Sequence, residues 1–250
     1  MSTILIVESN PASRPQAAPD FVAALAALQP AVKTRIVTPY DTPVADADLE
    51  DVSGAIFTGS GVDWCVDAPE AAPLRAVMER VFARSIPSYG SCNGMQMAAV
   101  VLGGASAASP NGRENGLARA VSLTEAGRTH PFLEGRSEGY AVPCIHRDEV
   151  TRLPAEAVLL AGNSHSLVQA FAYDAGGVRF WGVQYHPEVS PASMADVLTR
   201  IGGHDAAEIA DLRAAETNAD AARRLGAAPE DMQPAMRLTE IRNWLASLPG

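Results

Sequence analysis

The chain has 250 residues, of which 47% are hydrophobic, and a formal net charge of -10 at pH 7. That length can bury the core of one large α/β domain, or of one domain with an appendage. The acidic charge disfavours nucleic acid as a partner. The sequence contains no run of 18 apolar residues, so no membrane span is predicted. The first residues lack the basic and long apolar segments of a signal peptide, so a cytoplasmic location is expected.

Over the first hundred residues, short apolar runs of strand length alternate with segments of helical periodicity. Strands are expected at 4–7, 32–37, 54–57 and 86–89. Helices are expected at 21–28, 69–83 and 95–102. This alternation predicts an α/β fold with a mostly parallel sheet flanked by helices on both faces.

The middle of the chain has a different character, with strand-like runs joined by short connections. These runs are 117–123, 139–142, 158–161, 167–172 and 178–183. Since the connections are too short for regular crossover helices, antiparallel pairs are expected there. The last part is helical in composition, at 194–201, 206–225 and 234–248. We therefore expect one domain over 1–190 and a helical C-terminal extension over 191–250, which packs on the same domain or forms a homodimer surface.

The sharpest local feature is the run Gly90-Ser91-Cys92-Asn93-Gly94, between an apolar strand and an apolar helix. A central nucleophile with glycines two residues away on each side is typical of a nucleophile elbow, because the glycines let strand and helix approach closely. The free N–H groups at the start of the helix favour the thiolate, and the N–H of Asn93 can donate to an oxyanion. The alternative for Cys92 is a small buried hydrophobe, and the strand–turn–helix context favours the nucleophile.

The other two cysteines are interpreted as structural. Cys65 and Cys144 lie in no comparable motif, and an odd, small number of cysteines predicts reduced thiols in a cytoplasmic protein. Histidines and cysteines show no metal-ligand spacing along the chain, so neither a metal nor a cofactor is expected.

A second feature follows the apolar run 178–183, which leads into His186-Pro187-Glu188. Residues two apart on a strand point to the same side, so His186 and Glu188 are predicted to face one cleft. A histidine held by a carboxylate is the general base of a nucleophilic triad. Among the five histidines only His186 has an acidic residue at this spacing after an apolar strand. The alternative is a surface or packed histidine, and the pairing with the elbow favours a Cys92–His186–Glu188 triad.

The elbow, followed later by the run 182–188 (GVQYHPE), resembles the class I glutamine amidotransferases. The resemblance is closest to the amidotransferase domain of GMP synthetase and its free-standing relatives. The segment 146–154 is similar to the His-x-Asp-x-Val stretch of that group, and 57–61 stands in the place of its Gly-Gly-Pro oxyanion loop. The resemblance covers residues 3–190.

This resemblance implies a flavodoxin-like core and a cysteine-dependent hydrolysis of glutamine. The Cys92 thiolate would attack the side-chain amide, His186 would protonate the departing ammonia, and a γ-glutamyl thioester would be hydrolysed. The resemblance also implies an oxyanion loop at Gly59 and Ser60, working with the N–H of Asn93, and a substrate-holding role for Gln96.

The chain lacks the glycine-rich phosphate loop of a synthetase domain. The ammonia acceptor is therefore expected on a separate synthetase or acceptor subunit, unless the product is simply ammonia. One alternative is a γ-glutamyl hydrolase that uses the same triad on γ-glutamyl amides or peptides. Another is a non-catalytic regulatory subunit, against which the intact Cys92, His186 and Glu188 argue.

Overall fold

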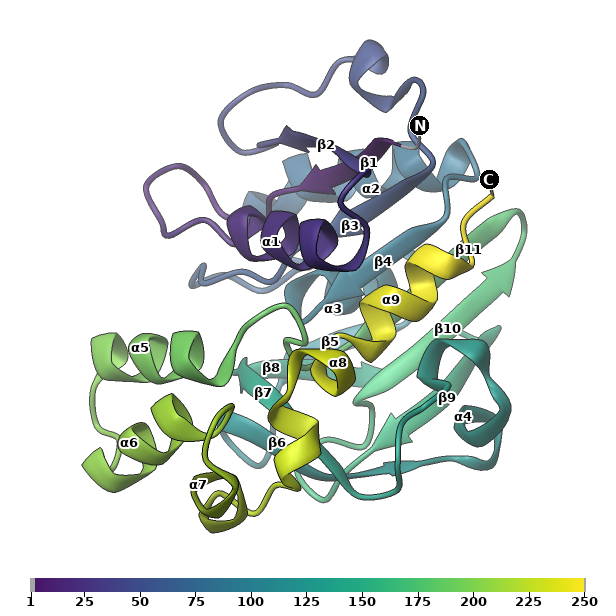
Figure 1. The fold of residues 1–250 in the computed structure, drawn as a ribbon. Helices are drawn as coiled ribbons and strands as arrows, with labels where there is room; N and C mark the ends of the chain where they lie inside the picture. The colour runs from purple at the N-terminus through teal and green to yellow at the C-terminus, as the bar shows by residue number, and fades with distance from the viewer. Residues whose placement is uncertain (1–2, 250) are drawn as a thin grey trace.

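The computed structural model describes residues 3–249. Their central sheet has nine strands in the order β2-β1-β3-β4-β11-β10-β9-β6-β7 (Figure 1). The strands are β1 Thr3–Val7, β2 Lys33–Val37, β3 Gly54–Phe57, β4 Ser88–Ser91, β6 Glu114–Leu123, β7 Tyr140–His146, β9 Ala157–Gly162, β10 Ala170–Ala175 and β11 Val178–Val183. The half from β2 to β11 is parallel, and β10, β9, β6 and β7 continue it in antiparallel pairs. The α/β fold and the antiparallel pairing in the middle of the chain are thus confirmed.

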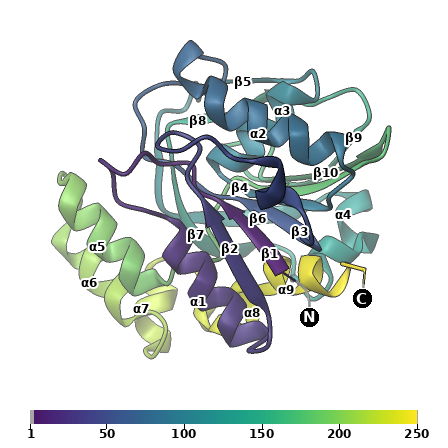
Figure 2. The same cartoon turned by 90° about the horizontal axis from the view of Figure 1, so that it is seen from above.

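Helices cover both faces of the parallel half (Figures 1 and 2). One face carries α1 (Ala18–Leu28) and α9 (Thr239–Ala246), and the other carries α2 (Ala72–Ala83) and α3 (Asn93–Val101). The period of two in β1 explains this division: Ile6 packs with Trp244 on the first face, and Val7 packs with Met78 on the second. The β1 side chains from Ile4 to Val7 are therefore buried whichever way they point.

A smaller core lies between the antiparallel strands and the C-terminal helices α5 (Pro191–Ile201), α6 (Ala206–Ala214) and α7 (Ala219–Arg224). The single helix expected over 206–225 is wrong. The side chain of Asn218 accepts hydrogen bonds from the first N–H groups of α7, so the chain starts a new helix there. The segment 234–248 is likewise divided, into α8 (Pro234–Arg237) and α9.

Several short elements have no counterpart in the sequence-based expectations. An antiparallel pair joins β5 (Ala105–Ala108) to β8 (Asp148–Arg152), and α4 spans Glu125–Thr129. Short 3-10 helices span Asp46–Leu49, Pro131–Leu133 and Pro229–Met232, and another, Pro69–Ala71, forms the start of the helix expected over 69–83. Within residues 3–249, no helix combines the length and the apolar character that crossing a membrane requires.

Candidate active site

Cys92 occupies the sharp turn between β4 and α3. Its φ of 48° and ψ of -104° are a strained combination for a residue with a side chain. Its N–H donates to the carbonyl of Val183 at 2.8 Å, which fixes the turn to the neighbouring strand. The flanking glycines are needed for steric reasons. A Cβ on Gly94 would lie 2.2 Å from the carbonyl oxygen of Phe57, and one on Gly90 would lie 2.7 Å from the carbonyl carbon of Gly94.

His186 and Glu188 meet close to this turn. Nδ1 of His186 lies 2.8 Å from Oε1 of Glu188. The hydroxyl of Ser91, the residue before the cysteine, lies 3.0 and 3.2 Å from the two carboxylate oxygens of Glu188. Ser91 was not singled out from the sequence, although its place directly before Cys92 is a signal that could have identified it.

The contact between His186 and Glu188 was expected, but the strand geometry offered for it is wrong. β11 ends at Val183, and His186 lies in the turn that follows. The backbone holds it there instead: the N–H of His186 donates to the carbonyl of Pro143 in β7 at 2.8 Å. The carbonyl of His186 in turn accepts from the N–H of Val189 at 3.2 Å, so the His-Pro-Glu segment is a closed turn against β7.

The environment of His186 favours its charged form. Burial alone would lower the pKa of the ring, but the Glu188 carboxylate and the Cys92 thiol outweigh it and raise that pKa well above its ordinary value of 6.5. Since Nδ1 faces the carboxylate, Nε2 remains for the thiol. Cys92, His186 and Glu188 are 6%, 8% and 6% exposed, so bulk water screens these interactions weakly.

The loop after β3 lies against the histidine. A Cβ on Gly59 would be 2.5 Å from Cε1 of His186, so only glycine fits between the loop and the ring. Asn10 holds the loop, since its Oδ1 accepts from the N–H of Gly61 at 2.8 Å and from the hydroxyl of Ser60 at 3.1 Å. The buried carboxylate of Glu8 holds Asn10 in turn, accepting from its backbone and side-chain nitrogens at 2.9 and 3.0 Å.

The N–H groups of Ser60 and Asn93 were expected to form the oxyanion site. Within the described residues, the N–H of Ser60 has no acceptor, and the N–H of Asn93 belongs to the first turn of α3, where helical partners are lacking. Gln96 has a different setting: its amide nitrogen donates to the carbonyl of Asp148 at 2.6 Å and to Oε1 of Gln184 at 3.2 Å. These bonds tie α3 to β8 beneath the turn.

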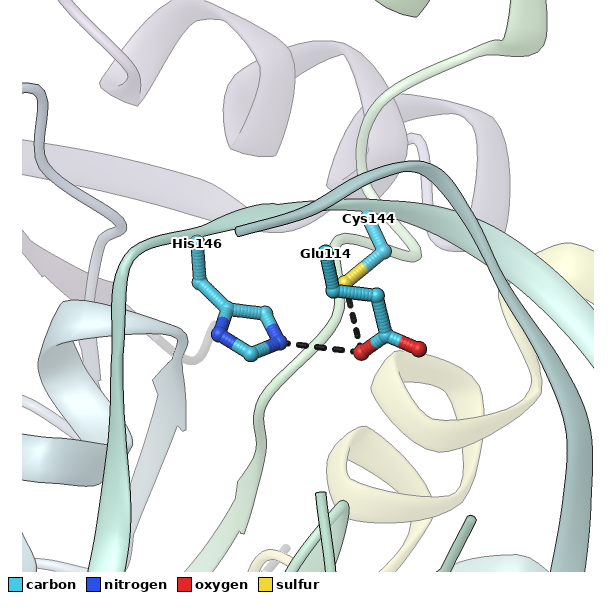
Figure 3. A group of neighbouring side chains, drawn as sticks. All are labelled: Glu114, Cys144 and His146. Atoms are coloured by element: carbon cyan, nitrogen blue, oxygen red, sulfur yellow. Dashed lines mark hydrogen bonds and ion pairs between the residues drawn. The ribbon is translucent and has the colours of Figure 1, made fainter. Parts of the chain in front are cut away.

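Strand β7 forms one side of the site. The Sγ atom of Cys92 lies 3.7 Å from the carbonyl oxygen of Ile145. The residues on either side of Ile145, Cys144 and His146, point to the same side of the strand, where they meet Glu114 of β6 (Figure 3). Spacing along the chain did not reveal this group.

Fold and site together define an α/β protein with a cysteine at a nucleophile elbow, next to a histidine held by a carboxylate. The sequence profile described as "Glutamine amidotransferase class-I" matches residues 23–201. The chain therefore belongs to the class I glutamine amidotransferase family, as its motifs predicted.

Similar proteins include two kinds of enzyme. The chain is 37% identical over 163 residues to the gamma-glutamyl-L-1-hydroxyisopropylamide hydrolase of a Pseudomonas species, covering 64% of this chain and 55% of that protein. It is 34% identical over 155 residues to the glutamine-hydrolysing GMP synthase of Symbiobacterium thermophilum, covering 61% of this chain and 28% of the synthase. The chain thus spans about half of the first relative and under a third of the second.

Solved structures show the same fold. A glutamine amidotransferase from Methylobacillus flagellatus superposes with a TM-score of 0.69 at 20% identity, covering 99% of this chain and 95% of that one. A glutamine amidotransferase from Thermotoga maritima has a TM-score of 0.63 at 20% identity, covering 98% and 96%.

Proposed function

We propose that this protein hydrolyses the side-chain amide of glutamine through Cys92, His186 and Glu188, giving glutamate and ammonia. The observation that carries the proposal is the setting of His186: its Nδ1 lies 2.8 Å from Glu188, and the Glu188 carboxylate and the Cys92 thiol raise its pKa. Family membership supports amide hydrolysis in general.

Each step has a group suited to it. The Cys92 thiolate adds to the amide carbon, and the N–H groups of Ser60 and Asn93 stabilise the resulting oxyanion. The raised pKa of His186 keeps a proton on the ring, and that proton passes to the leaving nitrogen as ammonia departs. The ring then takes a proton from water, which attacks the γ-glutamyl thioester and releases glutamate with a free thiol.

A second candidate is a γ-glutamyl hydrolase that acts on larger γ-glutamyl amides. The 37% identity to a gamma-glutamyl-L-1-hydroxyisopropylamide hydrolase favours it. Both candidates form the same thioester and differ only in the group that leaves, so the comparison of kcat/KM for glutamine and for γ-glutamyl alkylamides separates them.

If glutamine is the substrate, ammonia either passes to a synthetase or acceptor part or is itself the product. The similarity to GMP synthase over 28% of its length supports an amidotransferase part that works with a synthetase part. A cytoplasmic location and a homodimer through the C-terminal helices stay predictions.

The first test is the release of glutamate and ammonia by the purified chain beside Cys92→Ala. The proposal requires release that is lost in the variant. Equal release from both proteins refutes the role of Cys92. If glutamine is inert and γ-glutamyl alkylamides are cleaved, the second candidate holds. If neither is cleaved and no partner restores activity, a non-catalytic regulatory subunit remains.

A further inference from the structure

A buried group of metal-ligating side chains lies next to the proposed triad but takes no part in it. Glu114 and His146 are directly paired across β6 and β7, and Cys144 precedes His146 by two residues and so shares its side of the strand. Figure 3 shows the three side chains converging from the two strands. Glu114 is 7% exposed, Cys144 0% and His146 3%, and one ligand atom from each lies within 4.8 Å of the other two.

The hydrogen bonds of His146 direct one of its ring nitrogens at Glu114. Its Nδ1 lies 3.0 Å from the carbonyl oxygen of Asp148, which can only accept, so Nδ1 carries the hydrogen of the ring. In a neutral ring the lone pair of Nε2 would then face Oε2 of Glu114 at 2.9 Å. Two facing lone pairs repel in a buried site, so either a proton or a metal ion lies between them.

The surroundings match those of a metal site. A ligating histidine usually donates its other ring nitrogen to a carbonyl or carboxylate, as His146 does to Asp148. The carboxylate of Glu114 is oriented from two sides. The amide nitrogen of Asn163 donates to Oε1 at 2.7 Å, and that of Gln169 donates to Oε2 at 2.7 Å.

A fourth donor stands at the edge of the group. Nδ1 of His165 lies 3.9 Å from Oε2 of Glu114 and 3.1 Å from Oγ of Ser166. The ring of His165 meets that of His146 edge to face at 5.5 Å between centroids. Among the described residues, the buried Nε2 of His165 has no hydrogen-bond partner. Its side chain is 20% exposed, against 8% for Glu114 and 0% for His146, so this end of the group lies nearest to solvent.

We propose that Glu114, Cys144 and His146 form a site for a thiophilic divalent cation of the Zn²⁺ type, and that the ring of His165 turns toward the ion to become the fourth ligand. One sulfur, imidazole nitrogens and one carboxylate oxygen are the ligand types that Zn²⁺ accepts, whereas Ca²⁺ and Mg²⁺ prefer oxygen alone. A thiolate and a carboxylate balance the charge of the ion, so the buried site is neutral.

The site would stiffen the strand that borders the active site. Ile145 lies between Cys144 and His146, and its carbonyl oxygen is the one that the Cys92 sulfur contacts at 3.7 Å. An ion that joins β6 to β7 therefore fixes this carbonyl beside the nucleophile. The inference concerns binding and does not depend on the activity of the chain.

The test is a titration with Co²⁺ in a Cys65→Ala/Cys92→Ala protein. Of the three cysteines only Cys144 remains, and the competing Cys92–His186 pair is removed. We expect one equivalent of Co²⁺ with a sulfur-to-cobalt charge-transfer band, which Zn²⁺ abolishes, and a higher melting temperature with Zn²⁺. Adding Cys144→Ser should remove the band.

His165→Ala provides a second variant at a partly exposed position, where folding is not at risk. Its affinity should fall at least about 10-fold, with unchanged circular dichroism. The proposal is overturned if no charge-transfer band forms, if the band survives Cys144→Ser, or if His165→Ala binds as tightly as its parent. If no charge-transfer band forms, a proton and not a metal ion lies between Glu114 and His146.

Discussion

Replacing Gly59 with alanine would place a methyl group against the ring of His186. The new Cβ would lie 2.5 Å from Cε1, about 1 Å inside the distance at which ordinary contact begins, so the ring or the loop must move by that much. A displacement of about 1 Å in a catalytic group costs about 100-fold in rate, or about 2.7 kcal/mol in the activation barrier. We therefore expect kcat for ammonia release to fall about 100-fold in Gly59→Ala.

Gly61→Ala is the matched control in the same loop. The nearest atom to its new Cβ is Oδ1 of Asn10 at 3.9 Å, so the methyl group fits without any movement. Steady-state kinetics on both variants, with circular dichroism to verify folding, separate a local steric effect from general damage to the loop. If kcat of Gly59→Ala stays within about 3-fold of Gly61→Ala, the contact with His186 does not position the ring and the reasoning is wrong.

Further predictions concern two buried ion pairs. Glu188→Gln should lower kcat about a thousand-fold or more, because His186 loses the carboxylate that orients it, and an unchanged kcat would contradict the triad. Glu188 also raises the pKa of His186 in the folded protein. The pair therefore adds its full share to the unfolding free energy below the ordinary histidine pKa of 6.5, and this share is lost as the pH rises through the raised pKa. In urea titrations, the loss of unfolding free energy in Glu188→Gln should therefore shrink as the pH rises from the ordinary histidine pKa through the raised pKa of His186, and a loss that grows with pH would reverse the assigned sign. Glu240→Gln leaves Arg136 buried without its counter-charge, so the unfolding free energy should fall by about 3–5 kcal/mol. Arg223 forms an exposed pair with Asp220, so Arg223→Ala should leave the urea midpoint unchanged. Equal losses of stability in Glu240→Gln and Arg223→Ala would refute the role of burial.

The elbow could be predicted because its residues are neighbours in the sequence. Gly90, Cys92 and Gly94 stand together in one strand–turn–helix unit, although the close approach that requires Gly94 is to Phe57 of β3. The sequence motif His186-Pro187-Glu188 also predicted that His186 and Glu188 lie together. The actual turn was missed because it depends on a bond to Pro143, a partner more than forty residues away in sequence.

The group of Glu114, Cys144 and His146 lay beyond sequence reasoning for a related reason. Its members meet only through the register of β6 on β7, which periodicity within either strand does not determine. The break at Asn218 was missed because helical composition continues on both sides, and only the side-chain cap marks the new start. Strand β5 is short and alanine-rich, so it carries no period that could identify it.

The central claim is that Cys92 is the nucleophile, and covalent labelling tests it most directly. A thiol-directed glutamine analogue should add once to the protein, as intact mass shows, and peptide mapping should place the adduct on Cys92. Excess glutamine should protect the thiol, and His186→Ala should slow labelling strongly. Labelling of Cys65 or Cys144 in place of Cys92, or a rate that glutamine leaves unchanged, would contradict the proposed mechanism.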